Sequence, residues 1–262
     1  MFCFFLHFQT LMAATTTTSK YILYGSARSS CAWRVRAVLE HKCLPYEYRP
    51  VAIYSGEQHS AAYRRLNPAQ MIPALVVVVV VSGEEGKSTT ETLHESLAII
   101  DYLERVHPSP SIYPADPLTR ARSVAIAEMI VSSIQPVSSF KFMKTYAEAN
   151  GGDQQAALFF STQWIAYKFD RLQELIEMYN GGGGKESASR KFVIGNQLSI
   201  ADICLVPQLY TAARYKVDLG RWPLLNALYE QLLSEEAALF KVRPEAMADF
   251  HTTSSFVDND KQ

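Results

Sequence analysis

The sequence predicts a protein in two parts, a mixed α/β half followed by an all-helical half. Up to about residue 107, short β-branched or alternating segments take turns with helical apolar patterns. The stretch 108–117 is rich in proline, which excludes a continuous helix and marks a linker. Beyond it, apolar residues recur at helical spacing. A chain of 262 residues can bury a core for one large domain or two small ones.

The first half alternates strands and helices in an order that defines its fold. We expect strands at 21–24, 46–53, 73–81 and 89–93, and helices at 32–41, 59–66 and 96–106. The six consecutive valines at 76–81 have the composition of a buried strand, and the polar segment 82–87 predicts a turn after it. A helical crossover implies that the first two strands pair in parallel. The order βαβαββα is that of a thioredoxin-like domain.

Helical patterns dominate the second half. We expect one or two helices over 118–148, around Pro136, and further helices at 153–178, 200–215 and 224–233. Ser199 and Asp202 resemble a capping box at the start of one of them. The predicted organisation is a disordered extension at 1–19, the thioredoxin-like domain at 20–107, the linker at 108–117, a helical domain at 118–250 and a disordered tail at 251–262.

Composition excludes several classes of function. Apolar residues make up 48% and charged residues 19% of the chain, which is typical of a globular protein. The net charge of −1 gives no electrostatic footprint for nucleic acid, so we expect no such partner. Neither C-x-x-C nor zinc-ligand spacing occurs, so we expect reduced thiols and no metal. The four cysteines are Cys3, Cys31, Cys43 and Cys204.

The first residues are apolar but are not typical of a targeting segment. The stretch 1–14 lacks a basic region and is too short to span a bilayer, and no arginine precedes Arg28. The threonines at 15–18 indicate an unstructured segment, and translation could start at Met12. We therefore expect no membrane partner and a cytoplasmic protein, with a mitochondrial location as the weaker alternative.

The most informative motif is SSCAWRVRAVLE, residues 29–40, which follows the first strand and opens an amphipathic helix. Ser29 or Ser30 is a natural N-cap, and a helix N-terminus favours an anion. That anion could be the thiolate of Cys31 or the sulfur of a bound thiol cofactor. Small polar residues before a helix are also found as plain caps. Residues 29–36 match, letter by letter, the SSC-x-WRVR signature, and in this the chain resembles the zeta class of glutathione transferases.

The resemblance implies a site for glutathione as the cofactor. In the run NPAQMIPAL, it assigns a cis bond to Ile72-Pro73 and contact with the cysteinyl part of glutathione to Ile72. Ser96, expected as the N-cap of a helix, would bind the α-carboxylate of the γ-glutamyl end, and Glu95 before it would bind the α-amino group. The class more often has Gln where this chain has Glu95. Gln135, in the run IQP, would reach towards the same site.

The resemblance also implies a substrate pocket and an activity. Arg214 would lie over the pocket, and Arg28 or Arg34 could anchor carboxylates of the substrate. Ser138 and Ser139 stand where the class often has Gln-Asn, and the insertions at 82–90 and 181–190 are further departures. The implied activity is glutathione-dependent cis–trans isomerisation of maleylacetoacetate, a dicarboxylic diketo acid, to fumarylacetoacetate in tyrosine and phenylalanine breakdown. The family also implies a homodimer.

Within this reading, Ser29 is expected to be the main hydroxyl donor to the thiolate, together with Ser30, and Cys31 an assistant. Three alternatives remain open at this point. The protein could be a general transferase that conjugates glutathione to small electrophiles such as haloacids. It could be a glutaredoxin-like oxidoreductase that uses Cys31, or a glutathione-binding module without catalysis.

Overall fold

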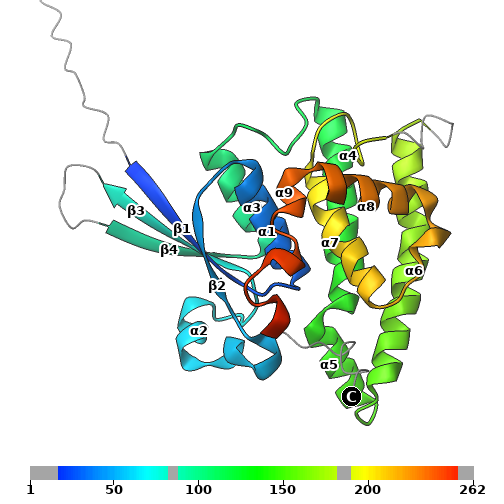
Figure 1. The fold of residues 1–262 in the computed structure, drawn as a ribbon, viewed down its shortest axis with the longest axis horizontal. Coiled ribbons are helices and arrows are strands. Elements are labelled where there is room, and N and C mark those ends of the chain that lie inside the picture. Colours follow the sequence, from blue (N-terminus) through cyan, green and yellow to red (C-terminus); the bar gives the residue numbers. More distant parts are fainter. Residues whose placement is uncertain (1–16, 82–87, 182–189, 253–262) are drawn as a thin grey trace, which may run out of the picture.

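The structure, a computed structural model, describes residues 17–81, 88–181 and 190–252. An α/β domain and a helical domain lie side by side, as predicted (Figure 1). The first domain contains one four-stranded sheet in the order β2-β1-β3-β4. Its strands are β1 (Thr17–Gly25), β2 (Tyr46–Pro50), β3 (Ala74–Val81) and β4 (Ser88–His94).

Strand pairing confirms the predicted topology and corrects two boundaries. β1 pairs in parallel with β2 and antiparallel with β3, which pairs antiparallel with β4. The prediction that 15–18 is unstructured is wrong for Thr17 and Thr18, because the valine run of β3 gives them partners in Val81 and Val80. β2 is shorter than expected and ends at Pro50, since proline has no N–H for the ladder. The turn expected at 82–87 lies outside the described residues.

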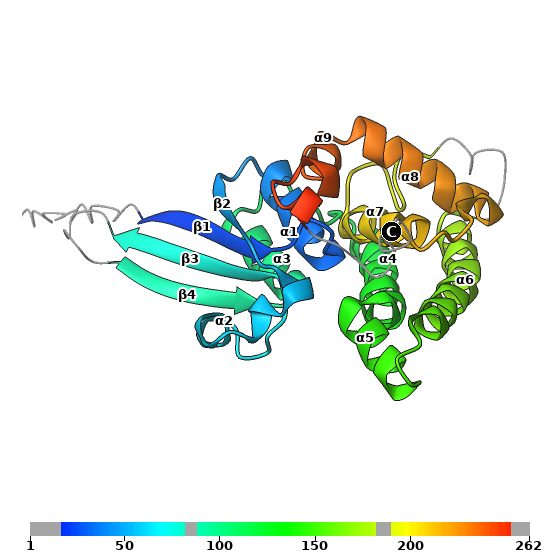
Figure 2. The ribbon, with the colours of Figure 1, turned by 60° about the horizontal axis from the view of Figure 1, so that its bottom comes forward.

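The helices of the first domain are α1 (Ser30–His41), α2 (Ala61–Leu66) and α3 (Ser96–Val106). α1 and α3 pack against each other between the sheet and the helical domain, as Figures 1 and 2 show. α1 also packs against α7, so one apolar core runs through both domains. Its members include Leu23, Val38 and Ile99 from the first domain and Phe169 and Leu205 from the second.

The helical domain contains α4 (Pro117–Glu128), α5 (Phe140–Ala149), α6 (Gln154–Tyr179), α7 (Ile200–Arg214), α8 (Pro223–Glu235) and α9 (Ala237–Phe240). The capping box is confirmed, because Asp202 Oδ2 accepts from Ser199 N at 2.8 Å and from Ser199 Oγ at 2.7 Å. A π-helix at Met129–Ile134 and a 3₁₀ turn at Gln135–Ser138 join α4 to α5 and were not predicted. Further 3₁₀ turns lie at Ile53–Ser55, Glu57–His59, Leu219–Arg221, Pro244–Ala246 and Phe250–Thr252.

One bent pair of helices is apolar enough to need comment. Within the described ranges no single helix is long and apolar enough to cross a membrane, but Pro117–Ser138 together with Phe140–Ala149 has the length and composition for it. Ile126, Ile130 and Ile134 of this pair are fully buried in the shared core. Burial inside the protein therefore explains their apolar character.

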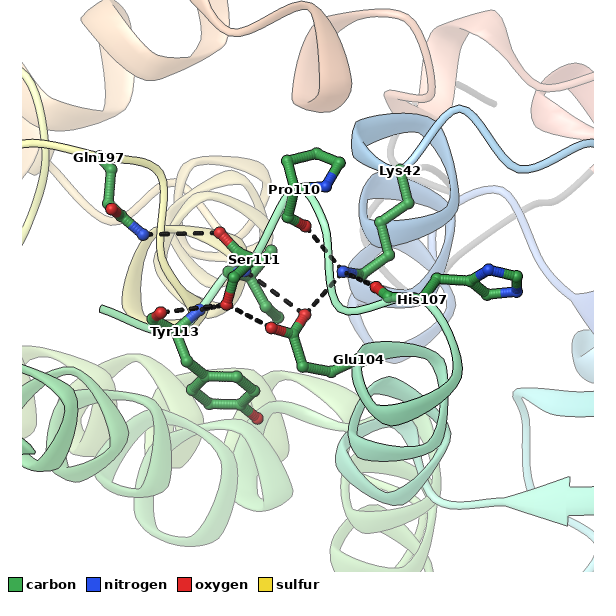
Figure 3. A network of polar contacts seen from close by, with 8 residues as sticks. Lys42, Glu104, His107, Pro110, Ser111, Tyr113 and Gln197 are labelled. Atoms are coloured by element: carbon green, nitrogen blue, oxygen red, sulfur yellow. Dashed lines mark hydrogen bonds and ion pairs between the residues drawn. The ribbon is translucent and has the colours of Figure 1, made fainter. Parts of the chain in front are cut away.

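A buried lysine fixes the linker between the two domains (Figure 3). Lys42 follows α1, and its fully buried Nζ lies 2.7 Å from Glu104 Oε2 of α3. The same Nζ donates to the carbonyl oxygens of His107 and Pro110, at 2.7 Å each. Glu104 also accepts from the hydroxyl of Ser111. These contacts satisfy both charges and set the direction in which the chain enters the helical domain.

Candidate active site

Strand register gathers three chain segments at one end of the sheet. Tyr24 lies opposite Ala74, which lies opposite His94, so the segments that adjoin these residues emerge together. They are the turn 26–29 before α1, the Ile72-Pro73 bond before β3, and Glu95-Ser96 before α3. A Cβ on Gly25 would come within 2.9 Å of the Ala32 Cβ, so glycine is required for α1 to start this close to the sheet.

The start of α1 is built as predicted. Ser29 is the N-cap, and its Oγ accepts from the backbone N–H of Ala32 at 3.2 Å. Since this bond uses only a lone pair, the Ser29 hydroxyl keeps its own proton to donate. Ser30 and Cys31 follow in the first helical turn, and all three side chains are half-buried at the wall of a cleft. The helix N-terminus and these groups together favour an anion.

The cleft has a volume of about 460 Å³ and lies between the two domains. Seven residues predicted for the site line it, namely Arg28, Ser29, Ser30, Cys31, Ile72, Gln135 and Arg214. Among the described residues that line it, none carries a carboxylate, whereas Arg28, Lys141, Lys144 and Arg214 carry positive charge. The cleft therefore suits an anionic ligand.

The Ile72-Pro73 peptide bond is cis, as the resemblance implied. Two side chains hold the segment before it, because Asn67 Nδ2 and the Tyr63 hydroxyl both donate to the Met71 carbonyl oxygen, at 2.7 and 2.8 Å. Ile72 lines the cleft, whereas Pro73 is buried behind it.

Glu95 and Ser96 lie at the same end of the sheet but do not line the cleft. The expectation that Ser96 is the N-cap is wrong, because Glu95 holds that position and Ser96 is the first residue of α3. Glu95 has φ +64°, a left-handed conformation that side-chain-bearing residues adopt where the surrounding structure imposes it, often at ligand sites. Ser96 is buried, and its Oγ accepts from Arg34 Nη1 at 3.5 Å.

Arg34 is not placed to anchor a substrate in the cleft, which corrects one of the two arginine assignments. Its side chain is fully buried beneath Cys31 and Ser96, and it does not line the cleft. The packing of α1 explains this, since α3 and α7 lie against the helix and all of its residues from 32 to 39 are buried. Arg28 does line the cleft, with its guanidinium 4.7 Å from the ring centre of Phe250.

The helical wall is shaped by the π-helix, which ends just before Gln135. Trp164 Nε1 donates to the Ser133 carbonyl oxygen at 2.8 Å and fixes the π-helix. The Tyr215 hydroxyl donates to the Ser138 carbonyl oxygen at 2.8 Å, and burial raises the pKa of Tyr215 to about 12, which keeps this donor protonated. These contacts hold Gln135 at the cleft.

The two cleft arginines lie near one tyrosine. Burial holds the pKa of Tyr210 above its ordinary value, while the positive charges of Arg214 and Arg28 act to lower it. Both arginines line the same cleft, although they come from the turn before α1 and from α7. This convergence could accommodate a ligand with more than one carboxylate.

Sequence reasoning missed two contributions. Lys141 and Lys144 of α5 line the cleft, and only their spacing on one helical face could have indicated this. The segment after α9 holds the turn before α1, because Asp249 Oδ2 accepts from the Ala27 N–H at 2.9 Å. From the sequence, the helical domain was expected to end at residue 250, and this contact with the first domain was not predicted. No cluster of three metal-ligating side chains occurs in the described ranges.

Comparison with known proteins gives the family. A model of the glutathione S-transferase N-terminal domain matches residues 28–106, and one of the C-terminal domain matches residues 163–236. Probable maleylacetoacetate isomerase 1 of Drosophila melanogaster is 36% identical over 226 residues, which cover 85% of this chain and 80% of that protein.

Solved structures agree with this assignment. A bacterial maleyl pyruvate isomerase, described as a zeta-class glutathione S-transferase, has a TM-score of 0.74 at 29% identity, covering 87% of this chain and 99% of its own. Maleylacetoacetate isomerase from Anaeromyxobacter dehalogenans, with glutathione bound in its active site, has a TM-score of 0.73 at 32% identity, covering 89% and 99%. A second structure of it holds dicarboxyethyl glutathione and citrate. The chain therefore belongs to the glutathione S-transferase family and, within it, to the zeta class that contains the maleylacetoacetate isomerases.

Proposed function

We propose that this protein is a maleylacetoacetate isomerase, which converts maleylacetoacetate to fumarylacetoacetate in the breakdown of tyrosine and phenylalanine. The observation that carries the proposal is the pairing of two walls of one cleft. The start of α1 presents hydroxyls and a helix N-terminus, and the opposite wall presents only positive charge among its ionised side chains. A thiolate and a dicarboxylic acid are the anions that these walls fit.

Bound glutathione supplies a thiolate that adds to the conjugated double bond, permits rotation about the resulting single bond, and leaves again. The residues of this chain prepare that chemistry. The Ser29 hydroxyl donates a hydrogen bond to the sulfur, and the N–H groups of the first turn of α1 favour the negative charge of the thiolate. Ser30 is a second hydroxyl donor, and Cys31 completes the same wall.

Two arginines of the cleft, one before α1 and one at the end of α7, bind and orient the substrate. Arg214 and Arg28 hold its carboxylates, because forked guanidinium groups match carboxylate geometry. Their positive charge also stabilises the negative charge that develops on the substrate when the thiolate adds. Gln135 reaches into the cleft from the end of the π-helix and contacts glutathione. The bound dicarboxyethyl glutathione and citrate in the bacterial relative support such an anionic pocket.

The decisive experiment incubates the purified protein with maleylacetoacetate, with and without glutathione, and follows both the substrate and the total free thiol. We expect loss of substrate only with glutathione, at constant thiol. A matching fall in thiol would instead indicate a transferase that conjugates glutathione, for which a halogenated acid is the natural second substrate. A mixed disulfide at Cys31 during turnover would indicate thiol–disulfide exchange.

Two further properties belong to the proposal. The family resemblance supports a homodimer, which light scattering on the full chain would test. Cys31, Cys43 and Cys204 are all free thiols, which supports the cytoplasm as location, with mitochondria as the alternative. Localisation of a tagged full-length protein would decide between the two.

A further inference from the structure

Two arginines of α1, two residues apart, are both fully buried but are satisfied very differently. All three kinds of nitrogen in Arg36 donate to carbonyl oxygens: Nε to Val242 at 3.1 Å, Nη1 to Ser26 at 3.2 Å and Nη2 to Ala27 at 3.0 Å. Arg36 thus joins the segment after α9 to the turn before α1, which is a structural task.

Arg34 has almost no such contacts. Only its Nη1 has partners, Ser96 Oγ at 3.5 Å and Cys31 Sγ at 3.7 Å, and both bonds are long. Nε and Nη2 have no hydrogen-bond partner among the described residues. No carboxylate of the described residues forms an ion pair with it. A fully buried, unpaired cation is costly, so an anion that approaches it is strongly favoured.

Neighbouring acidic groups do not supply that anion. The Cys204 thiol of α7 is influenced by Arg34, but burial raises its pKa to about 11, so it stays neutral near pH 7. Both carboxylate oxygens of Asp202 are occupied by Val193 and Ser199. Glu128 of α4 is exposed to water. The charge of Arg34 is therefore left for a ligand.

The contacts of Arg34 point to one part of that ligand. When the Ser96 hydroxyl accepts from Arg34, its own proton is directed elsewhere and can be donated to an anion at the N-terminus of α3. We propose that Arg34 is a positioning residue that orients the Ser96 hydroxyl and provides the buried counter-charge for the γ-glutamyl α-carboxylate of glutathione. This inference rests on the proposed function only for the identity of the ligand.

The test measures binding by calorimetry for three ligands: glutathione, S-methylglutathione, and the analogue γ-aminobutyryl-cysteinylglycine, which lacks the α-carboxylate. Arg34→Met should weaken the first two by about tenfold and leave the third unchanged. Arg34→Lys, which keeps the charge, should bind glutathione within about threefold of the wild type. The control is Arg105→Met, which removes an exposed charge from α3, the helix that begins with Ser96, and should change no affinity.

Several outcomes would overturn the inference. An equal penalty for all three ligands would mean that Arg34 acts only through the fold. A penalty that disappears with S-methylglutathione but persists without the α-carboxylate would assign Arg34 to the thiol. Because Arg34 makes few bonds and its buried charge is costly, the melting temperatures of Arg34→Met and Arg34→Gln should equal or exceed that of the wild type. Failure of both variants to fold would also refute the inference. An inactive wild type with the expected binding pattern would count against the proposed isomerase and leave this inference standing.

Discussion

The two ends of α1 both carry a buried cation, and they differ in what satisfies it. At the C-terminal end, Lys42 is paired with Glu104 and with two carbonyl oxygens, all within 2.7 Å. At the N-terminal end, Arg34 has two long contacts and no carboxylate among the described residues. A buried charge that is fully satisfied by the protein holds the fold together. We infer that a buried charge without such partners, like that of Arg34, is available to a ligand.

The largest effect is expected at the C-terminal end of α1, where the buried cation is fully paired. Lys42→Met leaves Glu104 charged, nearly buried and unpaired, which should lower the free energy of unfolding by about 3–5 kcal/mol. Glutathione affinity should not change. Chemical denaturation measures the free energy of unfolding, and calorimetry measures the affinity for glutathione. As a control, Lys241→Met breaks an exposed pair with Glu40 of the same 2.7 Å length and should cost only about 0–1 kcal/mol. Equal losses in both variants would remove the contrast between the two ends.

At the N-terminal end of α1, Ser29→Ala should have the opposite effect, a large loss of turnover with a small loss of stability. Turnover should fall about 100-fold, because one preorganised donor to the sulfur is lost. Stability should fall by only about 1 kcal/mol, the worth of an N-cap. Ser60→Ala is a matched control, since Ser60 caps α2 with an equal 3.2 Å bond but lies outside the cleft. Full turnover in Ser29→Ala would contradict the assignment of this hydroxyl.

Cys31→Ala sharpens the comparison by testing how much the neighbouring thiol adds. We expect a folded protein that loses less than about tenfold in turnover, because Ser29 and the helix N-terminus still favour the thiolate. Steady-state kinetics at saturating glutathione measures this effect. Cys43→Ala, which changes an exposed thiol outside the cleft, should be silent. A complete loss in Cys31→Ala would make the thiol essential and revive the redox alternative.

The smallest effect concerns His107 beside the satisfied end. Burial, and secondly the charge of Lys42, lower the pKa of His107 below 6.5. Between that lowered pKa and 6.5 the unfolded chain binds more protons, so the contribution of His107 to stability is present above pH 6.5 and is lost as pH falls through this window. An NMR titration should show a higher His107 pKa in Lys42→Met than in Lys241→Met. Identical values would show that Lys42 does not act on His107.

Local patterns predicted most of the fold and much of the cleft. The bounds of α3 agree with the prediction, because an apolar helical period there ends before two prolines. A continuous motif limited the N-cap of α1 to Ser29 or Ser30, and the structure assigns it to Ser29. The start of β1 was missed because its partners lie about sixty residues away, in β3. Arg34 was misplaced because arginine is ordinarily exposed and only packing against α3 and α7 buries it.

The π-helix at Met129–Ile134 has a consequence for how this protein can change over evolution. Each residue of a helix turns the chain by about 100°, so the loss of one residue here would rotate the side chain of Gln135 away from the cleft. Replacement of one apolar residue by another leaves that direction intact. Among homologous chains, the length of this segment should therefore vary less than its amino-acid sequence.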